Sequence, residues 1–240
     1  AQELDLDELT QHVVVCGWNK SGATVLKELF APGTPPGRSV VVVTESAEPP
    51  ADLPSEGVRM EHLYHHHGDY TRVDVLEAVG IKVASVVILL TDEVVPRSLQ
   101  DRDARTVLAA LTVERMAPHI YTVAELYSRQ NEELLRMAGV EEIVVGDWYA
   151  GMILGAVAAN RGLVTVLDEI LTAAHGNTFR TVELPTHWIG RTVAELHTEL
   201  FVQHRAVLIS IENPPRTVAV NPEPARELVS GDRLVVLCGD

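Results

Sequence analysis

The sequence predicts an α/β protein: a Rossmann-like, doubly wound parallel sheet, then a helical crossover, then a small C-terminal α+β lobe. Three observations lead to this prediction. Valine-rich runs of strand length alternate with helical patterns in the first part of the chain, two apolar helical segments follow, and a β pattern punctuated by prolines comes last. We therefore expect a Rossmann-like lobe at residues 1–147, a crossover at 148–178 and a C-terminal lobe at 179–240.

Six apolar runs predict the strands of the parallel sheet. They are His12–Cys16, Ser39–Val43, Val58–Tyr64, Ser85–Leu90, His119–Ala124 and Glu142–Val145. The unbroken valine runs of the first two suit strands that are buried on both faces.

Helices are predicted between these strands. Helical patterns follow Gly17 and cover Thr71–Val79, Ala104–Met116 and Asn131–Ala138, whereas Val95–Asp103 is expected to be a loop. Asp69 or Thr71 stands near the expected N-cap of the second helix, and Gly139 stands at the expected C-cap of the last.

Two apolar helices, Tyr149–Asn160 and Val164–Ala174, are predicted on either side of Gly162. The first is rich in small residues, which permit close approach of another helix. Packing on their own domain and dimerisation with a second copy are both open interpretations.

The C-terminal lobe shows a different pattern. We expect strands at Phe179–Leu184, Arg205–Ile211, Thr217–Val220 and Arg233–Cys238, with a helix near Val193–Leu200. Prolines such as Pro185 and Pro222 separate these elements, as Pro32–Gly37 separates two elements of the first lobe.

Composition excludes several classes of protein. The net charge of −15 argues against non-specific nucleic-acid binding, which needs clustered Lys and Arg. The two cysteines, Cys16 and Cys238, have neither metal-type nor disulfide-framework spacing, so a reducing cytosol is expected. No apolar run approaches the roughly 20 residues of a membrane span. The acidic start lacks an initiator Met and a signal peptide, so we expect a fragment or a product of internal initiation or processing.

The first predicted strand ends in a turn that resembles a dinucleotide fingerprint. The turn is Gly17-Trp18-Asn19-Lys20-Ser21-Gly22. Gly17 and Gly22 fit the first and third glycines, but Asn19 replaces the second, where a backbone approaches pyrophosphate. The helix N-terminus and Lys20 still favour an anion. The alternative is a Rossmann scaffold that has lost dinucleotide binding.

Polar residues at the end of the second predicted strand are candidates for ribose contacts. Thr44 leaves the strand and Glu45 follows it, at the distance where a ribose-binding acid is expected. A solvated loop carboxylate is the alternative for Glu45.

The histidines His65, His66 and His67 follow the third predicted strand. Because consecutive residues of an extended segment point to opposite faces, at most two of them can share one metal site without a turn. Exposed loop histidines are the favoured interpretation over a transition-metal site.

Carboxylates also follow three of the predicted strands. Asp69 follows the third, Asp92 and Glu93 the fourth, and Glu125 the fifth. Such an edge suits Ca²⁺ or is simply solvated. The chain contains no recognisable catalytic triad, Walker loop or zinc-protease motif, which argues against catalysis.

Three motifs together resemble a known family. They are His12-Val-Val-Val-Cys-Gly-Trp-Asn19, Gly68-Asp-Tyr-Thr-Arg72 and Leu134-Leu-Arg-Met-Ala-Gly139. Their order and spacing resemble the regulator-of-potassium-conductance (RCK) domain of prokaryotic ligand-gated potassium channels and Trk/Ktr-type transporters. The Cys-Gly-Trp start is more similar to the channel branch. The resemblance extends over nearly the whole chain, including the crossover and the small lobe.

The resemblance implies ligands for the crevice at the sheet edge. NAD(H) or an adenine nucleotide such as ADP or ATP is the first expectation, with contacts from Gly17, Trp18, Asn19, Lys20, Ser21, Gly22, Thr44, Glu45, Gly68, Asp69, Tyr70, Thr91 and Asp92. Asn19 and Thr44 depart from the nucleotide-binding pattern. Ca²⁺ is the second expectation: Glu125 matches one calcium ligand of the family, but Val123 and Leu90 replace its companion acids, so Asp92 would have to substitute.

The resemblance also implies a function. We expect a cytoplasmic, non-enzymatic ligand-sensing domain that forms homodimers and an octameric gating ring under a potassium channel pore at the inner face of the membrane. A detached regulatory subunit of a Trk/Ktr-type uptake system is the alternative, and a small NAD(P)-dependent oxidoreductase is the alternative from another class.

Overall fold

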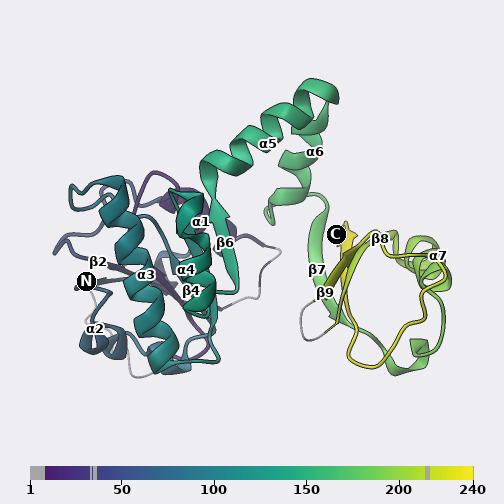
Figure 1. Cartoon of the computed structure of the whole chain (residues 1–240), viewed down its shortest axis with the longest axis horizontal. Coiled ribbons are helices and arrows are strands. Elements are labelled where there is room, and N and C mark those ends of the chain that lie inside the picture. The colour runs from purple at the N-terminus through teal and green to yellow at the C-terminus, as the bar shows by residue number, and fades with distance from the viewer. Residues whose placement is uncertain (1–8, 33, 35–36, 214–216, 240) are drawn as a thin grey trace. The chain divides into compact units, whose positions relative to one another are not determined.

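The computed structural model describes residues 9–32, 34, 37–213 and 217–239 (Figure 1). The chain divides into two compact units, one up to Ala159 and one from Asn160, and each is described by itself. The predicted division into three segments remains a prediction. Most of the acidic start and part of the predicted turn at Pro32–Gly37 lie outside the described residues.

The first unit contains a six-stranded parallel sheet in the order β3-β2-β1-β4-β5-β6. The strands are β1 (Val13–Cys16), β2 (Val40–Thr44), β3 (Leu63–His67), β4 (Val86–Leu89), β5 (Tyr121–Leu126) and β6 (Glu142–Val145). The order reverses between β1 and β4, so this is the switch point of a doubly wound sheet, at whose carboxyl edge ligands bind. The predicted fold class is confirmed.

Helices cover both faces of this sheet. They are α1 (Gly22–Leu29), α2 (Val73–Ala78), α3 (Leu99–Met116) and α4 (Glu132–Met137). Alternate valines of β1 enter different cores: Val13 and Val15 belong to one that includes Leu26 of α1, whereas Val14 belongs to one that includes Leu135 of α4. Figure 1 shows α3 and α4 side by side in front of the sheet. Burial on both faces explains the unbroken valine runs.

The structure corrects three sequence predictions. The third strand is Leu63–His67 rather than Val58–Tyr64, because Leu63 pairs with Val40 and the register continues to His67, which pairs with Thr44. The histidines therefore lie in a strand and not in a loop.

The start of α3 is the second correction. The segment predicted as a loop becomes helical at Leu99, because Ser98 Oγ accepts a hydrogen bond of 3.1 Å from the Asp101 backbone N–H and caps the helix. The third correction concerns α2, whose N-cap residue is Arg72 rather than Asp69 or Thr71.

The second unit contains an antiparallel sheet in the order β7-β10-β8-β9. Its elements are α6 (Leu163–Leu171), β7 (Thr178–Glu183), α7 (Val193–His204), β8 (Ala206–Asn213), β9 (Thr217–Val220) and β10 (Arg233–Cys238). Trp188, Leu196, Leu228 and Leu234 are buried in its core. A capping box between Thr192 and Glu195 starts α7, which packs on β8. The predicted α+β lobe is confirmed.

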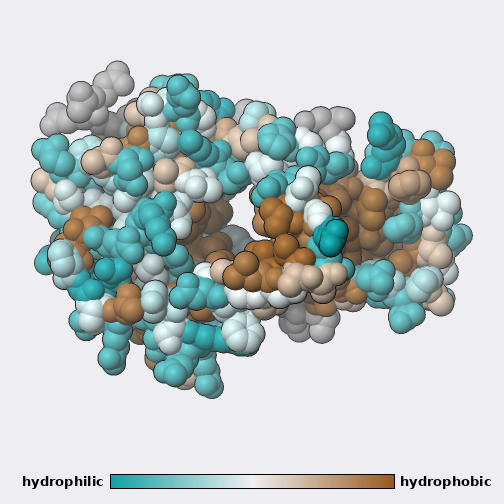
Figure 2. All heavy atoms as spheres, turned by 90° about the horizontal axis from the view of Figure 1, so that it is seen from above, coloured by the Kyte–Doolittle hydropathy of each residue, from teal (hydrophilic) through white to brown (hydrophobic). Residues whose placement is uncertain are grey.

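Helix α5 (Gly146–Ala159) ends the first unit and has no buried residue. Its apolar side chains are exposed, among them Trp148 and Leu154, and α6 likewise exposes Val166 and Leu171. Figure 2 shows brown, hydrophobic side chains exposed on the surface. A helix that is apolar all round normally packs against other protein. No helix among the described residues is both long enough and apolar enough to span a bilayer.

Candidate functional site

The loop after β1 forms the centre of the carboxyl edge. Gly17 has a φ of +82°, and a Cβ there would lie 2.9 Å from the Leu90 carbonyl oxygen. The next residue, Trp18, donates its backbone N–H to Asp92 Oδ1 over 3.0 Å, and its carbonyl accepts from the Glu93 N–H. Only glycine permits this approach, which fastens the loop to the end of β4.

Gly22, the last glycine of the turn, makes room for an indole ring. A Cβ on Gly22 would lie 2.7 Å from atoms of the Trp18 ring. That ring is 4% exposed and donates its Nε1–H to Asp52 Oδ1 over 2.7 Å. In this chain the glycine is therefore required by Trp18, which covers the start of α1.

Asn19 occupies the switch point with a buried side chain. Its Nδ2 donates to the Thr91 carbonyl at 2.8 Å, to Thr91 Oγ1 at 3.1 Å and to Glu125 Oε2 at 2.7 Å. Glu125 Oε2 also accepts from the Thr91 backbone N–H and hydroxyl. These three residues, here named the Asn19 cluster, join the ends of β1, β4 and β5.

A second group of polar residues joins the ends of β2, β3 and β4. Arg97 donates to Glu45 at 2.6 Å and approaches Asp92 at 3.4 Å. Arg105 of α3 lies 3.2 Å from Glu45 and 2.9 Å from Asp69. We name these five residues the charge network. Glu45, predicted to hold a ribose, has both arginines at its Oε2, and its contact with a ribose remains a prediction.

Two aspartates of the charge network have pKa values shifted in opposite directions. For Asp92, burial raises the pKa, and nearby Glu45 adds to the increase against the hydrogen bond from Trp18. For Asp69, burial also opposes ionisation, but hydrogen bonds from Thr71 and Arg105 outweigh it and lower the pKa. Asp92 is therefore the carboxylate whose charge the protein compensates less completely.

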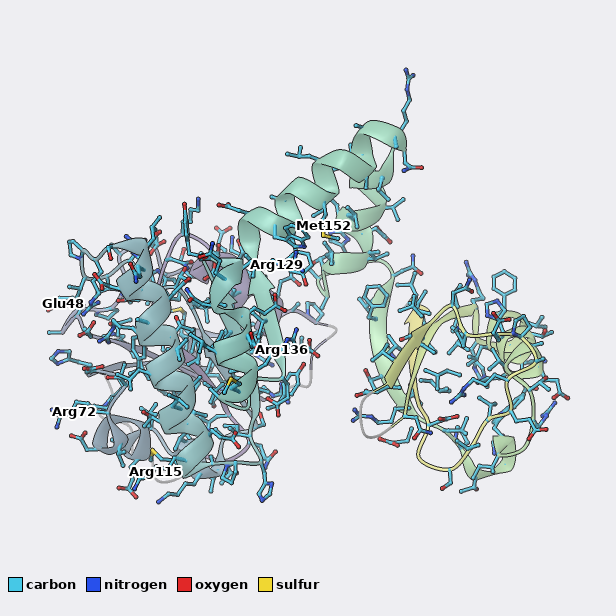
Figure 3. All side chains as sticks on the ribbon, in the orientation of Figure 1. Glu48, Arg72, Arg115, Arg129, Arg136 and Met152 are labelled. Carbon is cyan, nitrogen blue, oxygen red and sulfur yellow. The ribbon has the colours of Figure 1, made fainter. Side chains whose placement is uncertain are left out.

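A cavity of about 530 Å³ lies beside the loop after β1. Its lining residues are Trp18, Asn19, Lys20, Thr44, Ser46, Glu48, Pro49, Pro50, Ala51, Asp52, Glu93 and Val94. The volume falls within the range of small-molecule sites. Glu48, labelled in Figure 3, lies at the outer side of the first unit. Flat apolar groups, hydroxyls and carboxylates thus surround one space.

The predicted site residues lie in these three groups or in the loops around them. Trp18, Asn19, Lys20 and Thr44 line the cavity, whereas Glu45, Asp69 and Asp92 belong to the charge network, and Thr91 belongs to the Asn19 cluster. Gly17, Ser21, Gly22, Gly68 and Tyr70 do not line the cavity but shape the loops around it. Whether any of them contacts a ligand remains a prediction.

Sequence reasoning missed Arg97, Arg105 and the loop after β2. The two arginines carry no local motif, although Arg105 also lies over the Tyr70 ring, with its guanidinium carbon 5.0 Å from the ring centroid. The loop at 46–52 supplies much of the cavity wall, and its two adjacent prolines were the available signal.

The histidines of β3 and the predicted metal ligands form no assembled site. His65 Nε2 lies 2.8 Å from Thr44 Oγ1, and burial lowers the pKa of His65 and of His66. Among the residues that the structure describes, no group of three or more His, Cys, Asp or Glu is placed to hold a metal ion. Glu125 and Asp92 accept hydrogen bonds from the protein itself. Their metal binding remains a prediction.

A family model matches more than half of the chain. The TrkA-N domain model covers residues 13–146, which contain every strand of the parallel sheet and all the site residues described above.

Two curated relatives are potassium channel proteins. The calcium-gated potassium channel TvoK of Thermoplasma volcanium is 21% identical over 236 residues, covering 95% of this chain and 62% of the relative. The putative potassium channel protein YugO of Bacillus subtilis is 26% identical over 133 residues, covering 55% of this chain and 37% of the relative. The chain therefore spans less than two thirds of either relative.

One solved structure has the same fold over most of the chain. The human SLO3 gating ring matches with a TM-score of 0.63 at 14% identity, covering 95% of this chain and 44% of that one. At this identity the likeness concerns the fold alone.

Proposed function

This chain belongs to the TrkA-N domain family, and from that premise we propose that it is the ligand-sensing gating domain of a prokaryotic potassium channel. The family predicted from the sequence motifs is confirmed. The observation that carries the proposal is the similarity to TvoK, a potassium channel, over 95% of this chain and hence over both units. In this role, ligand binding shifts the population between conformations that favour an open or a closed pore.

We propose a nucleotide, NAD(H) or an adenine nucleotide, as the ligand, with the cavity beside β1 as its site. Pro49, Pro50 and Ala51 supply apolar surface for a base. Ser46 and Glu48 supply hydroxyl and carboxylate oxygens for a ribose, whereas the hydroxyl of the buried Thr44 is held by His65. The cavity thus combines apolar surface with several polar groups near the switch point, where open α/β sheets bind their ligands.

A divalent cation is the second candidate ligand. TvoK is described as calcium-gated, and Glu125 and Asp92 are the residues predicted for such a site. We favour the nucleotide over the cation. Oxygens of Glu125 and Asp92 already accept hydrogen bonds from backbone donors of the protein, which leaves fewer of them for a cation. We also favour a regulatory role over an enzymatic one, because the buried polar groups of the crevice hold the loops together.

The partners belong to the same proposal. Homodimerisation through α5 and α6 would cover Trp148, Leu154 and Leu171, which are exposed in the single chain. Assembly of such dimers into an octameric gating ring beneath a pore domain would place the chain in the cytoplasm at the inner face of the membrane.

A blocking substitution in the cavity tests the ligand site. Ala51 is exposed and lines the cavity, so Ala51→Trp fills the space without entering the core. We expect ADP to raise the Tm of the wild type, since a ligand at about 100 times its Kd stabilises by about 2.7 kcal/mol. The variant should lose most of this shift.

Ala47→Trp is the matched control. Ala47 is exposed in the same loop, four positions earlier, but does not line the cavity. It should retain the ligand-induced shift in a thermal denaturation assay with ADP, NAD⁺ and Ca²⁺ tested separately. Equal shifts in both variants would mean that the ligand binds elsewhere, and no shift with either nucleotide would remove the nucleotide from the proposal.

A further inference from the structure

We propose that Asn19 sets the size of the ligand: the cavity beside β1 takes a single nucleotide, and the Asn19 cluster excludes a dinucleotide. This inference rests on the proposed nucleotide ligand and narrows it from a choice between NAD(H) and adenine nucleotides to the latter. Its basis is the position of one buried side chain relative to the switch point of the sheet.

A dinucleotide must cross the switch point. In doubly wound folds its two nucleoside halves lie on opposite sides of this point, and the pyrophosphate passes close to the backbone at the second glycine of the turn. In this chain Asn19 stands there, 6% exposed, and bonds to Thr91 at the end of β4 and to Glu125 of β5. The passage between the ends of β1 and β4 is therefore filled by protein atoms.

Asn19 also occupies donors that a pyrophosphate would need. Its Oδ1 accepts the Ser21 backbone N–H at 2.8 Å, and its carbonyl accepts the Gly22 backbone N–H at 2.9 Å. Free N–H groups at a helix N-terminus are what bind phosphate in dinucleotide sites. Two of these donors at the start of α1 are thus already paired within the turn.

The negative charge of Glu125 also disfavours a dinucleotide. Glu125 Oε2 accepts three hydrogen bonds within the Asn19 cluster, so its carboxylate lies directly at the crossing. A pyrophosphate routed there would meet this negative charge at short range. A mononucleotide avoids it, because its terminal phosphate can point toward solvent beside Lys20, which lines the cavity and is exposed.

ADP and NAD⁺ are matched probes for this proposal. Both contain adenosine diphosphate, and NAD⁺ differs by the second nucleoside, which has to cross the switch point. By titration calorimetry we expect the wild-type chain to bind ADP at least about tenfold more tightly than NAD⁺, the factor that 1.4 kcal/mol represents. Asn19→Gly restores the second glycine, and it should reduce this ratio by at least about tenfold through tighter NAD⁺ binding.

Asn177→Gly is the control for a general loosening of the chain. Asn177 lies in the second unit and also uses its side chain, bonding to Glu169, so the chemical change is the same. This variant should keep the wild-type ratio of ADP affinity to NAD⁺ affinity. If Asn19→Gly does not fold, this ratio in the wild type still tests whether the site excludes a dinucleotide.

The outcomes separate the inference from the proposed function. Wild-type binding of NAD⁺ as tight as that of ADP, or an unchanged ratio in folded Asn19→Gly, overturns the role of Asn19 while the nucleotide site stands. Absence of binding by both probes overturns the nucleotide site and the inference with it. A gain of NAD⁺ binding in both glycine variants also overturns the inference, because loosening alone then explains it.

Discussion

Two buried aspartates, one in each unit, have pKa values shifted in opposite directions. Asp92 in the first unit and Asp232 in the second are each 1% exposed. Asp232 accepts two hydrogen bonds of 2.9 Å from Arg226, one from the Val229 N–H and one from Asn213 Nδ2. Asp92 accepts one from the Trp18 N–H, one from the Val94 N–H and a long one of 3.4 Å from Arg97.

The pKa values of the two carboxyls follow from these partners. Burial alone opposes the charged form of both. For Asp232 the bonds from Arg226, Val229 and Asn213 outweigh burial and lower the pKa, whereas for Asp92 burial prevails and the pKa is raised. The second unit thus uses its aspartate to hold loops together, and the first unit keeps a less compensated charge beside its ligand crevice, where perturbed groups tend to be functional.

The largest effect is expected from Asp232→Asn. The amide keeps the shape but presents an NH₂ group to the donors of Arg226 and leaves the guanidinium without its counter-ion. Breaking a buried pair on one side costs about 3 kcal/mol, so the second unit should unfold at clearly lower denaturant concentration. Urea titration followed by the fluorescence of Trp188, which is buried in that unit, measures the loss.

Asp74→Asn is the matched control. Arg72 holds Asp74 with the same two-bond geometry, at 3.0 Å and 3.0 Å, but both side chains are exposed. Figure 3 labels Arg72 on the outside of the first unit. Exposed pairs contribute little, so no measurable change is expected. A similar loss in both variants would show that burial does not distinguish these pairs.

The sequence predicted the parallel sheet well and the third strand poorly for one physical reason. Strands β1 and β2 lie inside the sheet and must be apolar on both faces, so their valines are a clear signal. Strand β3 lies at the edge, where half-buried polar residues such as His65 and His66 are tolerated. Its apolar pattern was therefore weak, and the predicted boundaries were wrong.

The candidate site was predictable only at positions whose role depends on their neighbours in the sequence. The departure at Asn19 was visible, and so was Thr44 at the end of a strand. The ion pairs of Arg97 and Arg105 with Glu45 join residues that are far apart in the chain, and their partners depend on how α3 packs on the sheet. Glu45 has the expected position for a ribose acid, but three-dimensional packing gave it other partners.

Acid should reduce the difference between wild type and Asp232→Asn. Because the folded pKa of Asp232 lies below its unfolded value of 3.8, its ionic contribution is complete above pH 3.8. The contribution is lost as the pH falls through the lowered folded pKa. Denaturation of both proteins between pH 6 and pH 2 should therefore show their stabilities converging below about pH 3.8. A constant difference over this range would mean that the charge of Asp232 is not what stabilises the loops.

A smaller effect than that of Asp232→Asn, and one of opposite direction, is expected from Asp92→Asn. The amide oxygen can still accept the Trp18 N–H, Arg97 keeps Glu45 at 2.6 Å, and the energetic cost of a buried charge disappears. Neutral replacements of buried ions are often tolerated or stabilising, so we expect a gain of up to about 1 kcal/mol at pH 7. Because the folded pKa of Asp92 is raised above 3.8, the cost in the wild type is complete above that folded pKa and vanishes as the pH falls toward 3.8. The advantage of the variant should disappear over the same range. A loss as large as that of Asp232→Asn would mean that the two aspartates serve the same structural role and that the charge beside the crevice has no separate significance.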